Sequence, residues 1–398
     1  MDLLTHHPYN RDDLPKPAFT LREAAGSVGD FGTILPIIFG VALVSDMNIS
    51  NILFFFGLWF IISGYYYRLP VPIEPMKAVG AVVIAGSLTH DIIAASGIII
   101  GIFFLLAGVM RWMGALKKYI PQNVIRGVQA ALALLLLRSA FGFATGDIIP
   151  FAIATLIIAL FWVGAKYTRL PDVSALIVVF GGVGAGILIT GMPEFVLPAL
   201  PTFYLPPLEV FSPAFTDLVL PQIPLTITNA ILATSLLTLD LFHHEIKPDR
   251  LSATIGVMNL VTVPFGGFPM CHGAGGMAGQ YRFGARTGGA NIIAGIILLA
   301  FAFFFASAGV LSIIPTGIFG ALLLFVAIEL GIHATKTDSL AVTGIMAVIS
   351  FAGNITIAFI IGMILAWGRI WYRRRKGLET DTEKNSATEV TAEKKAEE

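Results

Sequence analysis

Two proline-spaced stretches of this sequence have the composition of helix starts buried among apolar segments. The first, LPVPIEPMKAVG, covers residues 69–80, and the second, GGFPMCHGAGGMAGQYRFGARTGG, covers residues 266–289. Each contains a Pro-Met pair, Pro75-Met76 or Pro269-Met270, followed by small residues that permit close packing. A helix start leaves backbone N–H groups without partners and carries about half a positive charge. Two such starts that face each other would bind a small anion without a full side-chain cation.

The donors of this predicted anion site are backbone amides. Gly273 allows a ligand to approach the backbone closely, whereas for Gly275 and Gly279 ordinary packing of small residues between helices is the favoured explanation. The Cys-His pair favours a functional role, because polar side chains at membrane depth are costly unless they are used. The predicted contacts are Met76, Lys77, Ala78 and Val79 on the first start, and Cys271, His272, Gly273 and Ala274 on the second.

Side chains around the Pro-Met pairs leave several roles open. Glu74 and Lys77 are three residues apart, so they can neutralise each other either as a structural pair or as part of a mechanism. His272 either titrates and couples the process to protons, or only donates a hydrogen bond. Cys271 and His272 are adjacent and have no evident third ligand, so no metal site is expected.

Polar residues in other apolar segments add candidates. Asp30 and Thr33 lie at a glycine break in the first such segment. Asn229 falls near the middle of a later one, where it is expected to contact the ligand directly. Gln222, Thr226, Asn229 and Thr234 recur at roughly helical spacing, which makes one face of that segment polar. The residues expected to act in coupling or gating are Asp30, Glu74, Gln129 and Gln280. For Gln129 the alternative role is a hydrogen bond to a neighbouring helix.

Composition places these segments in a membrane. Hydrophobic residues make up 56% of the 398 residues and charged residues 13%, with a mean hydropathy of +0.83. A water-soluble domain of this size could not carry that balance on its surface, so the chain is predicted to be an all-α polytopic membrane protein. The formal net charge is zero, so no nucleic-acid partner is expected, and the single cysteine excludes an internal disulfide framework. The first residues lack an apolar run, so we expect no cleaved signal peptide, and no cofactor is implied.

Apolar periodicity divides the chain into two sets of seven predicted elements. The segment after Pro75 is apolar only over about 76–88. At about 1.5 Å per residue it is too short to cross roughly 30 Å of hydrocarbon, so it is predicted to be a half-helix, as is its counterpart at 270–281. The first set comprises 27–44, 51–67, 76–88, 91–111, 123–141, 148–167 and 173–190, and the second 216–239, 252–264, 270–281, 288–311, 315–333, 340–353 and 355–371.

The two sets are predicted to be inverted repeats. An offset of 194 residues superposes the two Pro-Met pairs, the Ile-Pro pairs at 120–121 and 314–315, and Gly101 on Gly295. Basic residues gather in alternate loops, with Arg138 as the main exception, and this indicates which loops face the cytoplasm. Because each set has an odd number of elements, the second must be inverted relative to the first. This architecture is typical of secondary transporters whose site lies at the midplane between half-helices.

The predicted organisation follows this pattern. It comprises a cytoplasmic N-terminal segment at 1–20, a first transmembrane repeat at 21–191, a proline-rich connector at 192–215, a second repeat at 216–372 and a disordered cytoplasmic tail at 373–398. Both termini are expected in the cytoplasm and the chain in the cell membrane, as a multi-pass protein.

Four stretches resemble the molybdate transporter family. PVPIEPMKAVGA resembles its first signature and FGGFPMCHGAGGMAGQYRFGARTGG its second, nearly residue for residue, while GSVGDFGTILP and QIPLTITNAILA are also similar. This family is similar in turn to the SulP sulfate permeases. The resemblance implies seven plus seven inverted elements with core and gate domains, and anion contacts at Thr33, Met76, Cys271 and Asn229. Glu74 stands where the first signature is expected to have glutamine, and only a short charged tail stands where SulP proteins usually carry a regulatory domain.

The predicted function is secondary active transport of a tetrahedral oxyanion, and the resemblance implies molybdate. Sulfate or another oxyanion stays open as the substrate, because amides and helix dipoles recognise charge and shape more than the central atom. An anion channel with the half-helices as its filter is a second alternative. An enzyme with Cys271 as nucleophile beside His272 is a third, and it lacks an orienting acid nearby. The expected partners are the oxyanion, membrane lipid and a second copy of the chain in a homodimer.

Overall fold

A computed structural model gives a mostly helical protein. It describes residues 14–117, 121–167, 173–194, 196–306, 308–352 and 355–376. Six of the described helices are long and apolar enough to cross a bilayer, or seven when the bent pair α1 (Leu21–Ser27) and α2 (Phe31–Val44) counts as one span. Five shorter apolar helices accompany them. The chain is therefore a polytopic helical membrane protein, as predicted.

The helices of the first half follow the predicted segments closely. The predicted span at 27–44 is broken, because α1 and α2 meet at an angle of 40° around Val28–Asp30. Gly29 lies at this break, and a side chain there would collide with the carbonyl of Gly279. The remaining helices are α3 (Ile49–Tyr67), α4 (Lys77–Gly86), α5 (His90–Val109), α6 (Met113–Lys117), α7 (Gln122–Gly146), α8 (Ile148–Tyr167) and α9 (Ser174–Thr190).

The second half opens with one helix that runs without a break from Leu208 to Phe242. It begins inside the stretch predicted as a connector, because Pro207 has the extended geometry of an N-cap and the helix can start directly after it. Pro224 removes a backbone donor from its interior, and π-helical turns flank this region. Its consecutive segments are η2 (Leu208–Val210), α10 (Phe211–Ala214), η3 (Phe215–Val219), α11 (Leu220–Leu225), η4 (Thr226–Ala233) and α12 (Thr234–Phe242).

Several predicted boundaries in the rest of the chain are wrong. The element predicted at 252–264 begins at Pro248, and the one predicted at 288–311 is divided into a helix that ends at Phe304 and another that begins at Ala308. The second short helix begins at Ala274 and not at Met270, because Met270–Cys271 forms strand β2, paired with strand β1 (Glu74–Pro75). The last helix continues to Arg375, beyond the predicted end at 371, and the tail from 377 lies outside the described residues. The helices here are α13 (Pro248–Thr262), η5 (Val263–Phe265), α14 (Ala274–Phe283), α15 (Gly289–Phe304), α16 (Ala308–Ser312), α17 (Thr316–Ala334), α18 (Leu340–Phe351) and α19 (Ile355–Arg375).

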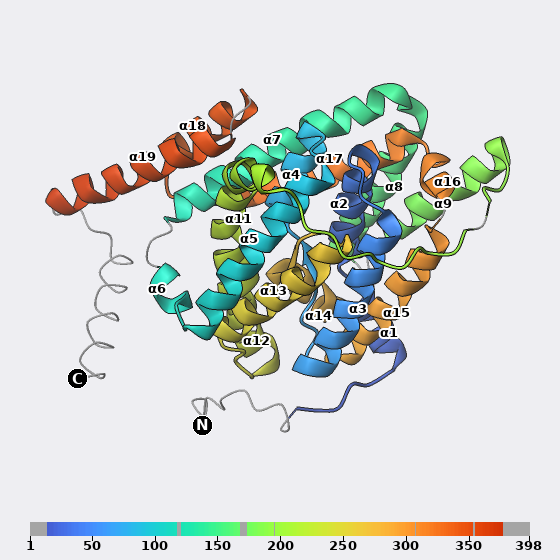
Figure 1. The fold of residues 1–398 in the computed structure, drawn as a ribbon, viewed down its shortest axis with the longest axis horizontal. Helices are drawn as coiled ribbons and strands as arrows, with labels where there is room; N and C mark the ends of the chain where they lie inside the picture. The colour runs from blue at the N-terminus through green and yellow to red at the C-terminus, as the bar shows by residue number, and fades with distance from the viewer. Residues whose placement is uncertain are drawn as a thin grey trace.

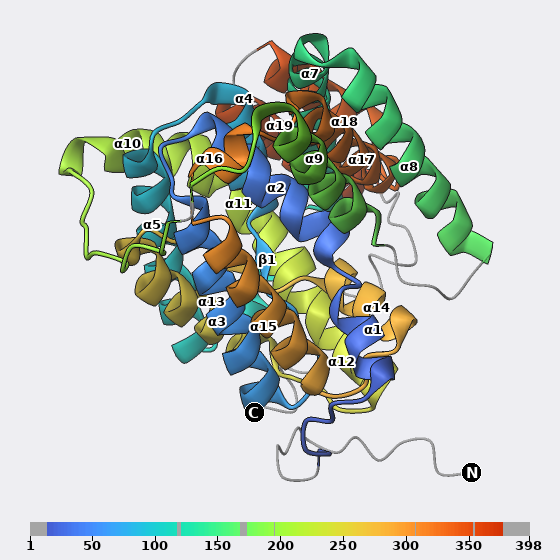
Figure 2. The same cartoon turned by 90° about the vertical axis from the view of Figure 1, so that its right-hand side faces the viewer.

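The helices form two layers (Figures 1 and 2). The strand layer consists of β1 and β2 with the helices around them: α3 packs on α15 and α5 packs on α13. The α7 layer consists of α7, α8, α17, α18 and α19, in which α17 packs on α7 and α8, and α18 packs on α7 and α19. In Figure 2 this second layer occupies the upper right of the view.

Glycines permit the close crossings inside the strand layer. A Cβ on Gly57 of α3 would lie 2.8 Å from the carbonyl oxygen of Gly295 of α15, and a Cβ on Gly295 would lie 2.5 Å from the carbonyl oxygen of Gly57. On the other pair, a Cβ on Gly101 of α5 would lie 2.9 Å from the side chain of Leu260 of α13. Small residues at such crossings let helix backbones approach in a membrane.

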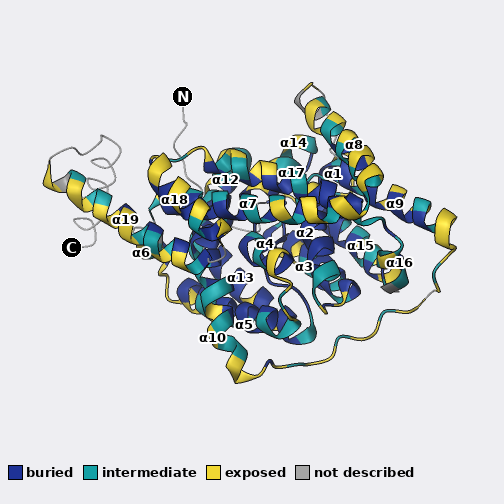
Figure 3. Ribbon diagram, turned by 90° about the horizontal axis from the view of Figure 1, so that it is seen from above, coloured by how far each residue is buried: buried dark blue, intermediate teal, exposed yellow. Residues whose placement is uncertain are grey.

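Burial separates the interior of the bundle from its rim (Figure 3). Only 22% of the apolar window of α19 is buried, whereas that of α17 is 61% buried. The exposed side chains on α8 and α19 are largely apolar, as expected of helices that face lipid. They include Ile149, Ile153, Leu156 and Leu160 on α8, and Ile357, Ile360, Ile364 and Leu365 on α19.

Candidate functional site

A short antiparallel strand pair fixes the centre of the candidate site. In its register Glu74 faces Cys271 and Pro75 faces Met270. Asn259 of α13 anchors the second strand, since its side-chain Nδ2 donates to the carbonyl of Met270 (2.7 Å) and its Oδ1 accepts from the amide of Met270 (3.0 Å). Because the strands are antiparallel, the two short helices that follow them, α4 and α14, begin on either side of the pair and run away from it.

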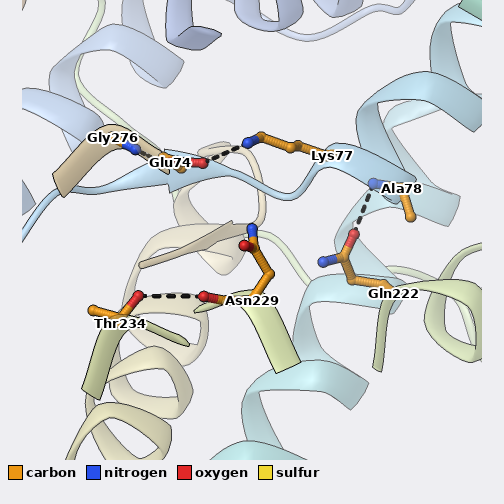
Figure 4. A network of polar contacts seen from close by, with 7 residues as sticks. All are labelled: Glu74, Lys77, Ala78, Gln222, Asn229, Thr234 and Gly276. Atoms are coloured by element: carbon orange, nitrogen blue, oxygen red, sulfur yellow. Dashed lines mark hydrogen bonds and ion pairs between the residues drawn. The ribbon is translucent and has the colours of Figure 1, made fainter. Parts of the chain in front are cut away.

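The start of α4 is capped by a side chain from the long helix of the second half. Oε1 of Gln222 accepts from the backbone amides of Ala78 (2.9 Å) and Val79 (3.3 Å), and its Nε2 donates to the hydroxyl of Thr226 (2.9 Å). Figure 4 shows the bond to Ala78. Two of the amides predicted to hold an anion are therefore paired with a neutral amide oxygen of the protein itself.

Replacing Gln222 with alanine should therefore destabilise the fold. Losing a helix N-cap costs about 0.5–2 kcal/mol, and leaving buried amides unpaired costs a similar amount. We expect Gln222→Ala to lower the midpoint of thermal unfolding in detergent by a few degrees, whereas Leu236→Ala, at a 60% exposed position on the same helix, should leave it unchanged. Equal midpoints for the two variants would contradict a capping role.

The start of α14 holds the carboxylate of Glu74. Its Oε1 accepts from the backbone amide of Gly276 (2.9 Å), and its Oε2 lies 3.0 Å from Nζ of Lys77. Figure 4 shows Glu74 between these two partners. A side chain on Gly273 or Gly276 would collide with this carboxylate and push it out of its present position. Glu74 thus acts as an internal anion at the positive end of a helix.

A cavity of about 370 Å³ opens in front of both helix starts. Ala274 and Gly275 line it, and their amides, the first two of α14, have no hydrogen-bond partner within the described ranges. Three basic side chains and two acidic ones line the same space, so its charge balance and its free donors both suit an anion. The charged residues are Lys77, Arg126, Lys336, Glu74 and Glu329, and the other lining residues are Gln129, Gln222, Leu225, Thr226, Asn229, Ala230, Cys271, Leu330 and His333.

Both layers of helices contribute to this cavity. Lys77, Asn229 and Cys271 come from the strand layer and the long helix beside it, and the side chain of Asn229 points toward the segment that carries Glu74 (Figure 4). The helices α7 and α17 of the other layer supply Arg126, Gln129, Glu329, Leu330 and His333. A displacement of one layer against the other would therefore change the cavity directly.

A second cavity of similar volume lies beside the first. The two share Gly275, Glu329 and His333 as lining residues. Thr33 and Asp30 line the second cavity and not the first. The two predicted groups of site residues are therefore neighbours across the start of α14.

Asp30 is a buried carboxylate without a partner. It is 2% exposed, and neither of its carboxylate oxygens has a hydrogen-bond partner in the part of the chain that the structure describes. A side chain on Gly276 would collide with Oδ2 of Asp30 as well as with Glu74, so the two carboxylates face the same turn of α14. Gln280, one turn further along α14, is fully buried and its side-chain amide is also unpaired among those residues. An ionised carboxylate in this setting is costly unless something neutralises it.

Cys271 and His272 face different spaces. Successive side chains of an extended strand point to opposite sides. Cys271 lines the cavity in front of the helix starts, whereas His272 lines a hollow between α3 and α13. Nδ1 of His272 lies 3.0 Å from the carbonyl oxygen of Pro72, and its Nε2 lies 2.8 Å from the hydroxyl of Thr254.

The predicted site residues thus fall into four groups. Glu74, Lys77, Gln129, Asn229, Cys271 and Ala274 line the first cavity, and Asp30 and Thr33 line the second. Met76 and Gly273 are the N-cap residues of α4 and α14, and Ala78 contributes an amide that Gln222 occupies. His272 and Gln280 line neither cavity.

Sequence reasoning missed four residues of the first cavity: Arg126, Glu329, His333 and Lys336. Glu329 and His333 are four residues apart in an otherwise apolar helix, which puts both on one face, and this spacing could have revealed them. No local signal separates Arg126 and Lys336 from ordinary basic residues near membrane surfaces.

Comparison of the sequence with known proteins gives consistent matches. The profile of a family described as "Molybdate transporter of MFS superfamily" matches residues 22–136 and 214–330. "Molybdate transporter 2" of Arabidopsis thaliana is 32% identical over 404 residues, covering 86% of this chain and 86% of that protein. "Molybdate transporter 1" of the same plant is 30% identical over 408 residues, covering 89% of each.

Solved structures of anion transporters share the fold at low sequence identity. The transmembrane domain of a cyanobacterium bicarbonate transporter, BicA, superposes with a TM-score of 0.64 at 16% identity, covering 87% of this chain and 97% of that one. Murine Slc26a9, in an inward-facing state, gives a TM-score of 0.69 at 13% identity, covering 91% of this chain and 70% of that one. At these identities the likeness concerns the arrangement of helices.

Proposed function

The chain belongs to the molybdate transporter family, and from that premise we propose that it is a secondary active transporter of a tetrahedral oxyanion, molybdate, that works by alternating access. The relatives are transporters and not enzymes, which removes the alternative of a nucleophilic Cys271. The observation that carries the proposal is the cavity in front of α4 and α14, with its excess of basic side chains and two helix-start amides that no group of the described residues accepts from.

The oxyanion binds at the start of α14. The amides of Ala274 and Gly275 donate to it, Lys77 supplies a counter-charge, and Asn229 donates from its side chain on the π-helical segment η4. Glu74 accepts from the amide of Gly276 in the same turn and neutralises part of the charge of Lys77. The site therefore offers few donors, and it favours an anion whose oxygens match their positions.

Packing between the halves supports the inverted repeat. The second long helix of the first half, α3, packs on α15, while α13, its counterpart in the second half, packs on α5, the counterpart of α15. In the same way α7 packs on α18 and α17 packs on α8, and α7 and α17 pack on each other. A two-fold relation between 21–191 and 216–372 produces such an exchange, and the antiparallel pairing of β1 with β2 agrees with it.

The division of the cavity between two layers supports alternating access. The anion is held by the strand layer, through α14, Lys77 and Asn229, while α7 and α17 close the cavity from the other side. Rocking of one layer against the other then opens the site to each side of the membrane in turn. Both termini lie in the cytoplasm in this scheme, and the homodimer stays a prediction.

The proposal assigns coupling to Asp30. Among the described residues its carboxylate has no hydrogen-bond partner, and it lies near Glu74 at the bend between α1 and α2, next to the anion site. A proton on Asp30 removes the repulsion between the two carboxylates and offsets part of the charge of the incoming anion.

We expect Asp30→Asn to uncouple uptake from a proton gradient. Asparagine keeps the shape of the side chain and cannot exchange a proton, so molybdate should still bind within about threefold of its wild-type affinity, because the anion contacts are untouched. Uptake into proteoliposomes should then no longer respond to an inside-alkaline pH step. Undiminished stimulation by the pH step in Asp30→Asn would assign coupling to another group, and Asp217→Asn, on a different helix, is the control.

Accumulation of labelled molybdate in proteoliposomes tests the proposed function. A coupled transporter raises the internal concentration above the external one when a gradient is imposed, and uptake saturates with substrate. A channel only equilibrates the two sides. Saturable accumulation that excess tungstate suppresses and excess sulfate does not is the expected result, and simple equilibration would contradict secondary active transport.

A further inference from the structure

A hollow on the outside of the strand layer has an apolar body. It lies between α3 and α13, has a volume of about 310 Å³, and has a surface that is almost entirely apolar. Its walls are one face of each helix, at the spacing of three and four residues that puts side chains on a single stripe. Trp59, Ile62, Ser63, Tyr66 and Tyr67 line it from α3, and Arg250, Ala253, Thr254, Val257 and Met258 from α13, with His272 as the remaining lining residue.

One end of this hollow is basic. A second hollow adjoins it and shares Tyr66, Arg250 and Ala253 with it. Arg111 and Lys247 line this second hollow together with Arg250, and the single acid there, Asp249, accepts a hydrogen bond from the amide of Met113. The two hollows therefore form one continuous groove, apolar at one end and with an excess of positive charge at the other.

We propose that this groove binds an anionic phospholipid. The apolar length from Arg250 to Met258 spans about two turns of α13, or roughly 12 Å, and takes part of an acyl chain. The basic end takes the phosphate, with Arg111, Lys247 and Arg250 as its partners. The aromatic ring of Tyr66, which lines both hollows, suits the boundary between acyl chain and headgroup, and Trp59 lies further along the apolar body. This site is separate from the anion cavity, and the proposal does not depend on the transported substrate.

The lipid would lie directly behind the anion site. His272 lines the groove, and Cys271, the residue before it at the end of β2, lines the anion cavity. Thr254 of α13 connects α3 to the segment that follows β2, because its hydroxyl lies within hydrogen-bond distance of both the hydroxyl of Tyr67 (2.7 Å) and Nε2 of His272 (2.8 Å). An occupant of the groove therefore packs against the strand pair that positions α4 and α14.

Quenching of Trp59 fluorescence by brominated lipids tests the proposal. The full-length protein is reconstituted in phosphatidylcholine vesicles in which brominated phosphatidylglycerol or brominated phosphatidylcholine replaces a rising fraction of the lipid. The difference between wild type and Trp59→Phe isolates the signal from the groove. We expect saturable quenching by the anionic lipid. Its affinity for the groove should exceed that of the neutral lipid by about fivefold for each basic side chain that contacts the phosphate.

Charge substitutions supply the control. Lys247→Gln combined with Arg250→Gln should reduce the preference for phosphatidylglycerol at least about fivefold, because both side chains are exposed and their loss leaves the fold intact. Arg138→Gln, at an exposed arginine of α7 away from the groove, should keep the preference. Equal quenching of Trp59 by both lipids in the wild type, or a preference that survives the double substitution, would overturn the assignment.

Discussion

Gly276→Ala is expected to abolish molybdate uptake. A methyl group at this position would collide with the carboxylates of both Glu74 and Asp30, and it would displace the carboxylate that accepts from the amide of Gly276 at the start of α14. A displacement of about 1 Å at a binding site can cost a factor of about one hundred in rate, and overpacking a buried site costs about 1–3 kcal/mol in stability. Uptake into proteoliposomes, compared at equal amounts of folded protein, should fall at least about a hundredfold.

Neighbouring glycines provide matched controls for this variant. At Gly275 a Cβ would meet no atom within 4 Å, so Gly275→Ala should fold normally and report only the effect of a methyl group inside the cavity. Gly181 of α9 is equally open and lies away from the cavity, so Gly181→Ala should transport like the wild type. If Gly276→Ala transports as well as Gly181→Ala, the contact between α14 and Glu74 is not needed for function.

Substitutions of Lys77 and Glu74 should separate folding from binding. Lys77→Met leaves Glu74 buried and without its cation, and breaking a buried pair in this way costs about 3–5 kcal/mol. Glu74→Gln alone keeps an acceptor for the amide of Gly276, and the double variant removes both charges together. We expect a large fall in thermal stability for Lys77→Met, and recovery of most of it in the double variant.

Molybdate affinity should follow a different order. A bond between Lys77 and the anion is charge-assisted and contributes about 1.5–3 kcal/mol, so both variants without Lys77 should bind about ten- to a hundredfold more weakly. Glu74→Gln should bind at least as tightly as the wild type, because it frees Lys77 from its partner. Wild-type affinity in the stable double variant would show that Lys77 serves the fold only.

The sequence predicted those parts of the site that have local signals. Pro75-Met76 ends an extended stretch, and α4 begins at Lys77 as expected. Asn229 is polar in an apolar helix, and it lines the cavity. The charges of Glu74 and Lys77 are close in sequence, and they do form an ion pair. In each case the responsible interaction lies within a few residues or follows from the cost of a polar group at membrane depth.

Contacts between distant segments could not be predicted in the same way. The two-residue strands are too short for a periodic pattern, and their pairing moved the start of α14 from Met270 to Ala274. The cap of α4 comes from Gln222, which is 144 residues further along the chain. Glu74 accepts from the amide of Gly276, which is 202 residues further along the chain. The extended backbone at the end of β2, which directs the side chain of His272 away from that of Cys271, likewise depends on a strand pairing that the sequence does not display.

The fold also bears on the wider relationships of the chain. The description of its family refers to the MFS superfamily, whereas the helices superpose on BicA and on murine Slc26a9. The exchange of packing partners between the halves is the observation behind the proposed inverted repeat, which remains a prediction. The proposed binding site is the cavity in front of the starts of α4 and α14.

Calorimetric titration of purified protein with molybdate tests the central claim most directly. The account predicts saturable binding that tungstate matches and sulfate does not. It also predicts that Asn229→Ala weakens binding about tenfold, through loss of a hydrogen bond to the anion. Leu236→Ala, at the exposed position on the same helix, should bind like the wild type. Absence of oxyanion binding to folded protein, or equal affinities for Asn229→Ala and Leu236→Ala, would contradict a site between the starts of α4 and α14.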